Sequence, residues 1–211
     1  MVIMTSIILT AQNAFYYLGF PPYVALLILW LSLIGSMVNI PLTIVESETV
    51  EYARIPIRFF GITYVLPVKT EPKRALVAIN FGGAVLPTII SIALLISKPI
   101  AILYAVPGII IASVVINRFA QIIPGIGIAV PFLIPPVVSA LLALLLTFND
   151  LSLAPLVAYT IGVFGSLIGA DLMNLKKTPE MGAPIVSIGG AGTFDGVFLS
   201  GAFAVALIAM I

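Results

Sequence analysis

The chain reads Thr160-Ile-Gly-Val-Phe-Gly-Ser-Leu-Ile-Gly-Ala-Asp171 in its last third, and this run predicts a membrane-spanning helix. An uncharged run ends in a carboxylate where an ordinary spanning helix would carry leucine or valine. An aspartate at the centre of a bilayer costs roughly 2.5–3.5 kcal/mol on insertion scales, so it is a functional hypothesis by default. A second aspartate ends the glycine-rich run Gly189-Gly-Ala-Gly-Thr-Phe-Asp195. Asp171 and Asp195 are therefore the candidate catalytic residues.

The composition around this stretch predicts an integral membrane protein. Hydrophobic residues make up 62% of the chain and charged residues only 8%, whereas soluble domains carry about 25% charged residues. Cysteine and histidine are both absent. Their absence excludes disulfides, thiolate nucleophiles, Ser-His hydrolysis and histidine-based zinc sites. We expect no metal and no cofactor, and carboxylates must perform any hydrolytic chemistry.

Apolar runs predict an all-α polytopic membrane protein that forms one integral membrane domain over residues 1–211. At about 1.5 Å per residue, the six predicted spans reach roughly 26 to 38 Å, which brackets the hydrocarbon thickness of a bilayer. The first 20 residues lack the features of a signal peptide and stay in the predicted mature chain. The spans are placed at Pro22–Ile40, Ala75–Ile96, Ile100–Ile116, Pro131–Phe148, Leu151–Leu175 and Asp195–Ile211.

The basic residues predict how these spans are oriented in a cell membrane. Lys98 alone falls on one side of the six-span arrangement. The positive-inside rule then places the other side in the cytosol and both termini outside the cell. The residues on the cytosolic side are Arg54, Arg58, Lys69, Lys73, Arg74, Arg118, Lys176 and Lys177.

The long predicted cytosolic loop, residues 45–74, has the composition of a β-hairpin. Residues 49–60 and 62–68 are rich in β-branched and aromatic types and are separated by Gly61. Pro56 and Pro67 favour edge strands. The hairpin either covers the membrane surface or offers an edge to a peptide strand.

Polar residues and glycines gather near the predicted cytosolic ends of the spans. A helix from Ala183 to Ile211 would be about 43 Å long, so we expect a broken or re-entrant segment before a sixth helix that begins near Thr193. Asp171 falls on a different helix face from the small residues around Gly165, which predicts that it faces a groove or cavity. The supporting polar cluster is Asn80, Asn117, Arg118, Gln121, Asn174 and Thr193, and the glycine loop is Gly189, Gly190, Gly192 and Gly196.

Two strings carry a family resemblance. Gly169-Ala-Asp-Leu-Met-Asn-Leu175 and Gly189-Gly-Ala-Gly-Thr-Phe-Asp-Gly196 resemble those of a family of membrane proteins catalogued as domain of unknown function 1614. They are also distantly similar to the Gly-x-Gly-Asp aspartyl intramembrane proteases of the presenilin and signal peptide peptidase type. Here two residues separate the glycine motif from Asp195, and alanine rather than tyrosine precedes Asp171.

The protease resemblance implies that the two aspartates meet near the cytosolic face and cleave transmembrane peptide substrates. Two adjacent carboxylates in a low dielectric share one proton, so one activates water while the other donates to the peptide carbonyl.

Three alternatives remain open at this stage. The aspartates form the ligand site of a small-solute or Na⁺/H⁺ transporter or binding protein, with a broken helix beside them. Arg118 pairs with one aspartate in a structural salt bridge, or Thr193 or Asp195 simply caps a helix. A non-catalytic membrane scaffold would need neither carboxylate. The expected partners are the lipid bilayer and a transmembrane peptide, without nucleic acid.

Overall fold

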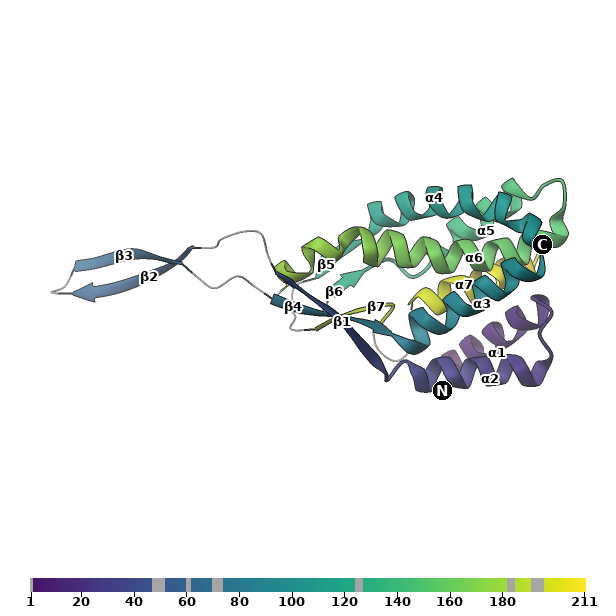
Figure 1. The fold of residues 1–211 in the computed structure, drawn as a ribbon, viewed down its shortest axis with the longest axis horizontal. Coiled ribbons are helices and arrows are strands. Elements are labelled where there is room, and N and C mark those ends of the chain that lie inside the picture. The colour runs from purple at the N-terminus through teal and green to yellow at the C-terminus, as the bar shows by residue number, and fades with distance from the viewer. Residues whose placement is uncertain are drawn as a thin grey trace.

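The structure, a computed structural model, describes residues 2–46, 52–59, 62–69, 74–123, 127–181, 185–190 and 196–211. Its helices pack side by side into one bundle, and short strands lie at one end of that bundle (Figure 1). A two-stranded hairpin projects from the same end. The candidate site lies where the strands meet the helices.

The described residues fold mainly into helices, several of which contain short segments of π or 3-10 geometry. The α-helices are α1 (Val2–Tyr17), α2 (Pro22–Gly35), α3 (Leu86–Ser97), α4 (Ile102–Phe119), α5 (Ile134–Leu146), α6 (Ala154–Ser166) and α7 (Gly196–Ile208). The π segments are η1 (Phe81–Val85) and η4 (Leu167–Asp171), and the 3-10 segments are η2 (Pro99–Ala101), η3 (Leu151–Leu153) and η5 (Leu172–Met181).

The described strands form three small sheets, and only the largest joins distant parts of the chain. The central strand of the largest sheet pairs antiparallel with one neighbour and parallel with the other, in the order β1-β4-β7. The other two sheets are the hairpins β2-β3 and β5-β6. The strands are β1 (Asn39–Glu46), β2 (Tyr52–Phe59), β3 (Ile62–Lys69), β4 (Arg74–Asn80), β5 (Gln121–Ile123), β6 (Gly127–Ala129) and β7 (Ile185–Ile188).

Helix α6 lies at the centre of the bundle and packs against α4 and α7 through small residues. A Cβ added at Gly165 would lie 2.9 Å from the Cβ of Ala112 in α4, and one added at Gly162 would lie 2.9 Å from the Cα of Gly201 in α7. The Oγ atoms of Ser166 and Ser200 lie 2.8 Å apart in the second contact. Small residues let helix backbones approach closely where lipid provides no hydrophobic driving force between helices. These contacts fix the position of α6 and of the Asp171 segment that follows it.

The six-span prediction is wrong. Among the described residues, only Pro99–Phe119 (21 residues) and Leu151–Lys177 (27 residues) are long and apolar enough to cross a membrane. The other apolar helices have 10–17 residues, so they reach at most about 26 Å, less than the roughly 30 Å of hydrocarbon. The apolar runs are longer than these helices because they include strand residues: Asn39 and Ile40 belong to β1, and Ala75–Asn80 belong to β4. The fold is therefore mostly helical with small sheets, and it is not all-α.

The N-terminal residues form a helix that the six-span prediction left out. Tyr17, at the end of α1, and Met210 line one small cavity, so α1 ends near the C-terminus of the chain and begins away from it. Figure 1 shows the N-terminus in the half of the bundle nearer the sheet and the C-terminus at the far end. The prediction that both termini share one side is therefore not supported by the arrangement of the helices.

The predicted hairpin is present. β2 and β3 pair antiparallel from Tyr52↔Lys69 to Phe59↔Ile62. The predicted non-helical segment before the last helix is also present, since residues 185–188 form β7 and α7 begins at Gly196. Residues 185–188 are extended because they pair in parallel with β4. The local sequence does not reveal this pairing.

Candidate functional site

Asp171 lies at the end of the π segment η4, and a hydrogen bond fixes its carboxylate against the turn after β7. Oδ2 of Asp171 accepts a hydrogen bond from the main-chain N–H of Gly189 at 2.7 Å. Gly189 has a φ of +68°, and a Cβ there would lie 2.6 Å from the Cβ of Ala84. Both the backbone conformation and the space therefore require glycine at this position. The glycine loop predicted from the sequence contributes in this way to the position of the carboxylate.

Two asparagines of the predicted polar cluster stabilise the backbone beneath Asp171. The Nδ2 of Asn117 in α4 donates to the carbonyl oxygen of Gly169 at 2.9 Å, and the Nδ2 of Asn174 donates to the carbonyl oxygen of Ala170 at 2.9 Å. A π segment shifts the regular helical hydrogen bonds, and such segments occur frequently at functional sites. Asn117 and Asn174 thus satisfy carbonyl groups of this segment.

A cavity of about 700 Å³ lies beside Asp171. This volume is within the range of about 300–1,000 Å³ that ligand sites usually have. Hydrophobic side chains from α4, α5, α7 and β6 form much of the wall, so the predicted position of Asp171 beside a cavity is confirmed. The polar side chains among the described lining residues are Asn39, Ser166, Asp171 and Ser187.

Asn39 and Ser187 belong to a second set of hydrogen bonds at the same cavity, centred on Asn80. The side chain of Asn80 is buried. Its Nδ2 donates to the carbonyl oxygen of Ser36 at 2.7 Å and to Oδ1 of Asn39 at 3.0 Å, and its Oδ1 accepts from the N–H of Gly83 at 2.8 Å. The Oγ of Ser187 also donates to Oδ1 of Asn39. Asn80 therefore joins α2, β1 and η1 and supports the two polar residues that line the cavity.

Sequence reasoning missed Asn39 and Ser187 as site residues. Asn39 falls near the end of an apolar run, and Ser187 falls in a segment expected only to be irregular. Their pairing depends on contacts 148 positions apart in the chain. The uncharged polar side chain at each position was the only local signal.

Of the other predicted site residues, two are exposed, two line the cavity with Asp171, and three lie outside the described residues. Arg118 and Gln121 are exposed near the end of α4 and in β5. No ion pair joins Arg118 to Asp171, so the structural salt bridge between these two residues is not formed. Gly190 and Gly196 line the cavity. Gly192, Thr193 and Asp195 lie outside the described residues, so the carboxylate pair and the capping alternative stay predictions. The described part of the chain holds no group of three or more acidic, histidine or cysteine residues placed to bind a metal ion.

The comparison with protein families matches residues 33–207 to a family model described as "Protein of unknown function (DUF1614)". This match covers most of the 211 residues and includes both strings that carry the resemblance, with Asp171 in the first of them. The chain belongs to this family. Neither the curated proteins nor the solved structures contain a match to the chain. The family resemblance predicted from the two strings is confirmed, and the similarity to aspartyl proteases receives no support from these comparisons.

Proposed function

We propose that this member of the DUF1614 family is a membrane protein that binds a ligand in the cavity beside Asp171. The ligand carries a positive charge or hydrogen-bond donors. One observation carries the proposal: Asp171 is the only ionisable side chain among the described residues that line the cavity. Its Oδ2 accepts from Gly189, and no described residue bonds to Oδ1.

A carboxylate favours a cationic or donor ligand over an anionic one in such a site. Two unit charges about 4 Å apart interact by about 1 kcal/mol in water and by more where the effective dielectric constant is lower. The uncharged lining, with Asn39, Ser166 and Ser187, provides hydrogen-bonding groups that orient a ligand without competing for the carboxylate. This arrangement supports the small-solute or cation-binding alternative derived from the sequence.

The outer surface of the helix bundle supports a membrane location. In the central helix segment Leu151–Lys177, 72% of the most apolar stretch is buried inside the molecule, whereas in Pro99–Phe119 only 33% is buried. Many other large apolar side chains of the bundle are also exposed, and an extensive exposed apolar surface of this kind is typically covered by another apolar phase. They come from four helices and include Leu27, Trp30, Ile34, Ile89, Ile96, Leu103, Ile110, Leu141 and Leu145.

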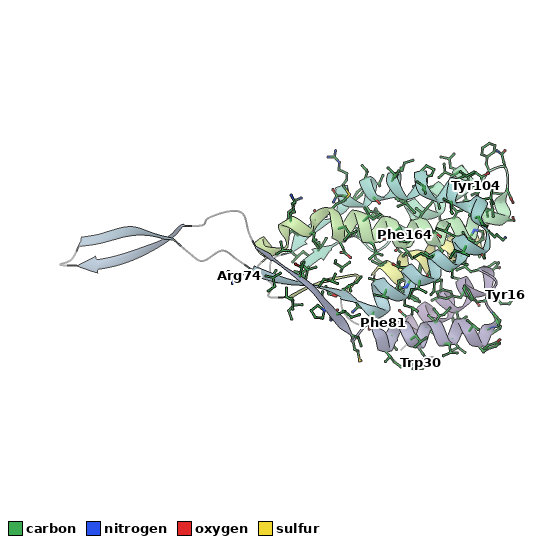
Figure 2. The ribbon with its side chains drawn as sticks, viewed as in Figure 1. Tyr16, Trp30, Arg74, Phe81, Tyr104 and Phe164 are labelled. Carbon is green, nitrogen blue, oxygen red and sulfur yellow. The ribbon has the colours of Figure 1, made fainter. Side chains whose placement is uncertain are left out.

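The distribution of charged and aromatic residues supports a chain that crosses the membrane more than once with the sheet end in the cytosol. Arg118, Lys176 and Lys177 lie at the ends of α4 and of the α6 segment, and Figure 2 shows Arg74 at the sheet end of the molecule. Tyr16 and Tyr104 lie at the opposite end (Figure 2). Basic residues favour the cytosolic side, and tyrosines favour the membrane–water interface.

One observation favours a hydrolase as the second candidate function. Gly196, the residue next to Asp195 in the sequence, lines the same cavity as Asp171. A hydrolase needs both carboxylates, so Asp171→Asn and Asp195→Asn would each abolish cleavage of a reporter transmembrane peptide. Unchanged cleavage by either variant would exclude this candidate.

Calorimetric titration of the protein in lipid nanodiscs with butylammonium tests the leading proposal. We expect saturable binding, and we expect Asp171→Asn to weaken it about tenfold or more because hydrogen bonds to charged groups contribute about 1.5–3 kcal/mol. Asp150→Asn is the matched control, since Asp150 is exposed and bonds to Ser152 away from the cavity. Equal affinity in the wild-type protein and Asp171→Asn would contradict the proposal.

A further inference from the structure

One wall of the cavity is the last strand of a sheet. Among the described strands, β7 pairs only with β4, so its other edge has no strand beside it. The outer edge of such a strand presents unpaired N–H and C=O groups to its surroundings. Ile185, Val186 and Ser187 of β7 line the cavity, followed by Gly189 and Gly190. The N–H groups of Gly189 and Gly190 already donate to Oδ2 of Asp171 and to the carbonyl oxygen of Ser187. The edge available for pairing is therefore that of the strand residues before this turn.

A second strand that has a single partner among the described strands borders the same cavity. β6 pairs with β5 in a two-stranded sheet, and all three residues of β6, together with Val130, line the cavity. Two end strands from separate sheets thus border one space. Ile128 of β6 packs against the small cluster formed by Ala75 of β4 and Val186 of β7, so β6 adjoins the sheet that contains β7.

The outer edge of β7 can template the pairing of a further strand, because an edge strand presents N–H and C=O groups that no neighbouring strand occupies. An extended peptide satisfies such an edge better than a small solute, because each of its residues offers an N–H and a C=O at the strand spacing. The four residues of β7 span about 13 Å, enough to pair with a peptide of similar length.

We propose that the ligand of this cavity is a polypeptide segment in extended conformation that adds to the free edge of β7. Asp171, at the same cavity, binds a lysine or arginine side chain or a free N–H of that segment. The apolar wall formed by residues such as Ile116 and Phe132 accommodates apolar side chains of the peptide. This inference rests on the proposed function, because it names the chemical class of the ligand that Asp171 binds.

Backbone methylation of a peptide tests the strand pairing directly. The probe is the acetylated and amidated hexapeptide Ala-Ala-Lys-Ala-Ala-Ala, compared with the same peptide carrying N-methyl groups on alternate amides and with butylammonium. We expect the hexapeptide to bind at least fivefold more tightly than butylammonium. Two methylated peptides are made, one for each set of alternate amides, because only one set points toward β7. We expect methylation of that set to weaken peptide binding at least fivefold, since it removes backbone hydrogen bonds of about 0.5–1.5 kcal/mol each.

The outcomes separate this inference from the proposed function. Equal binding of methylated and unmethylated peptides, or no saturable peptide binding, overturns the strand pairing. If butylammonium still binds and depends on Asp171, the proposed function survives that result. Peptide binding that is sensitive to methylation and unchanged in Asp171→Asn supports the pairing and contradicts the role of the carboxylate.

Site-specific photocrosslinking locates the bound peptide. A benzoylphenylalanine at position 185 replaces an isoleucine of β7 that is 57% exposed, and one at position 42 replaces a leucine that is 55% exposed in β1, the strand at the opposite edge of the sheet. We expect the hexapeptide to crosslink to position 185 at least fivefold more than to position 42. Equal crosslinking at the two positions, or none at position 185 under saturating peptide, overturns the inference.

Discussion

Oδ2 of Asp171 lies 2.7 Å from the main-chain nitrogen of Gly189, and this hydrogen bond joins the end of the central helix segment to the turn that follows β7. The bond connects the carboxylate of the site with the sheet edge that borders the same cavity. It leaves one carboxylate oxygen free of described protein partners. A structural role for the first oxygen and a ligand-binding role for the second are therefore compatible in one side chain.

Replacing Asp171 by alanine is expected to destabilise the fold more than replacing it by asparagine. Asparagine keeps an oxygen that accepts from Gly189, whereas alanine leaves this partly buried N–H without its partner, at a cost of about 1–3 kcal/mol. The midpoint of chemical unfolding in detergent measures the difference. Equal destabilisation by the two variants would show that the hydrogen bond to Gly189 contributes nothing to stability.

Gly189→Ala is expected to be more destabilising than Gly19→Ala. Both glycines have positive φ angles, +68° and +89°, so each alanine is expected to lower the free energy of unfolding by about 1–2 kcal/mol through the left-handed conformation alone. Only at Gly189 would the new Cβ meet another residue, Ala84, at 2.6 Å, because nothing lies within 4 Å of a Cβ at Gly19. Thermal unfolding measures the difference, and a larger decrease in unfolding temperature for Gly19→Ala than for Gly189→Ala would contradict the packing seen at Gly189.

The contact between α6 and α7 is expected to tolerate no side chain at Gly162. A Cβ there would lie 2.9 Å from both the Cα of Gly201 and the carbonyl oxygen of Ser200, which are backbone atoms that cannot move aside cheaply. Gly162→Val therefore forces α6 and α7 apart, and overpacking of this kind costs typically 1–3 kcal/mol. Gly196→Ala serves as the control, since a Cβ at Gly196 meets nothing within 4 Å. Similar unfolding midpoints for the two variants would contradict the close contact between α6 and α7 at Gly162.

The proposed orientation predicts which single cysteines react from which side of the membrane. The chain has no native cysteine, so each introduced thiol is unique. Lys177→Cys is expected to react with an impermeant maleimide only from the cytosolic side, and Lys98→Cys only from the outside. Both side chains are exposed. Labelling of both thiols from the same side would refute the orientation.

Local sequence patterns predicted the helices around the site better than the sheet beside it. The run from Leu151 to Lys177 is helical as its composition indicates, and Asp171 lines a cavity as its helical position predicts. The run from Ala75 to Ile79 is equally apolar but forms β4, because short apolar runs fit a buried strand as well as a helix. Its partners are 30 or more positions away along β1 and more than 100 away in β7, and no local pattern specifies such pairings.

The polar residues of the candidate site show the same contrast between predictable helices and an unpredictable sheet. Asn117 and Asn174 could be predicted near Asp171 because all three lie on helices at a similar depth. Asn39 and Ser187 could not, since they reach the cavity only through the pairing of β1, β4 and β7. The sequence therefore pointed to Asp171, whereas the strand that lines the same cavity could not be predicted from it.

The most direct measurement is the rate at which a single cysteine in the cavity reacts with thiol reagents of opposite charge. Ser187→Cys places a unique thiol on the cavity wall, and a cationic methanethiosulfonate is predicted to modify it at least about fivefold faster than an anionic one because the carboxylate of Asp171 attracts the cation. Adding Asp171→Asn should bring the two rates together, whereas Asp150→Asn should leave their ratio unchanged. Equal rates with Asp171 intact, or a faster reaction of the anionic reagent, would contradict the claim that this carboxylate selects positively charged ligands.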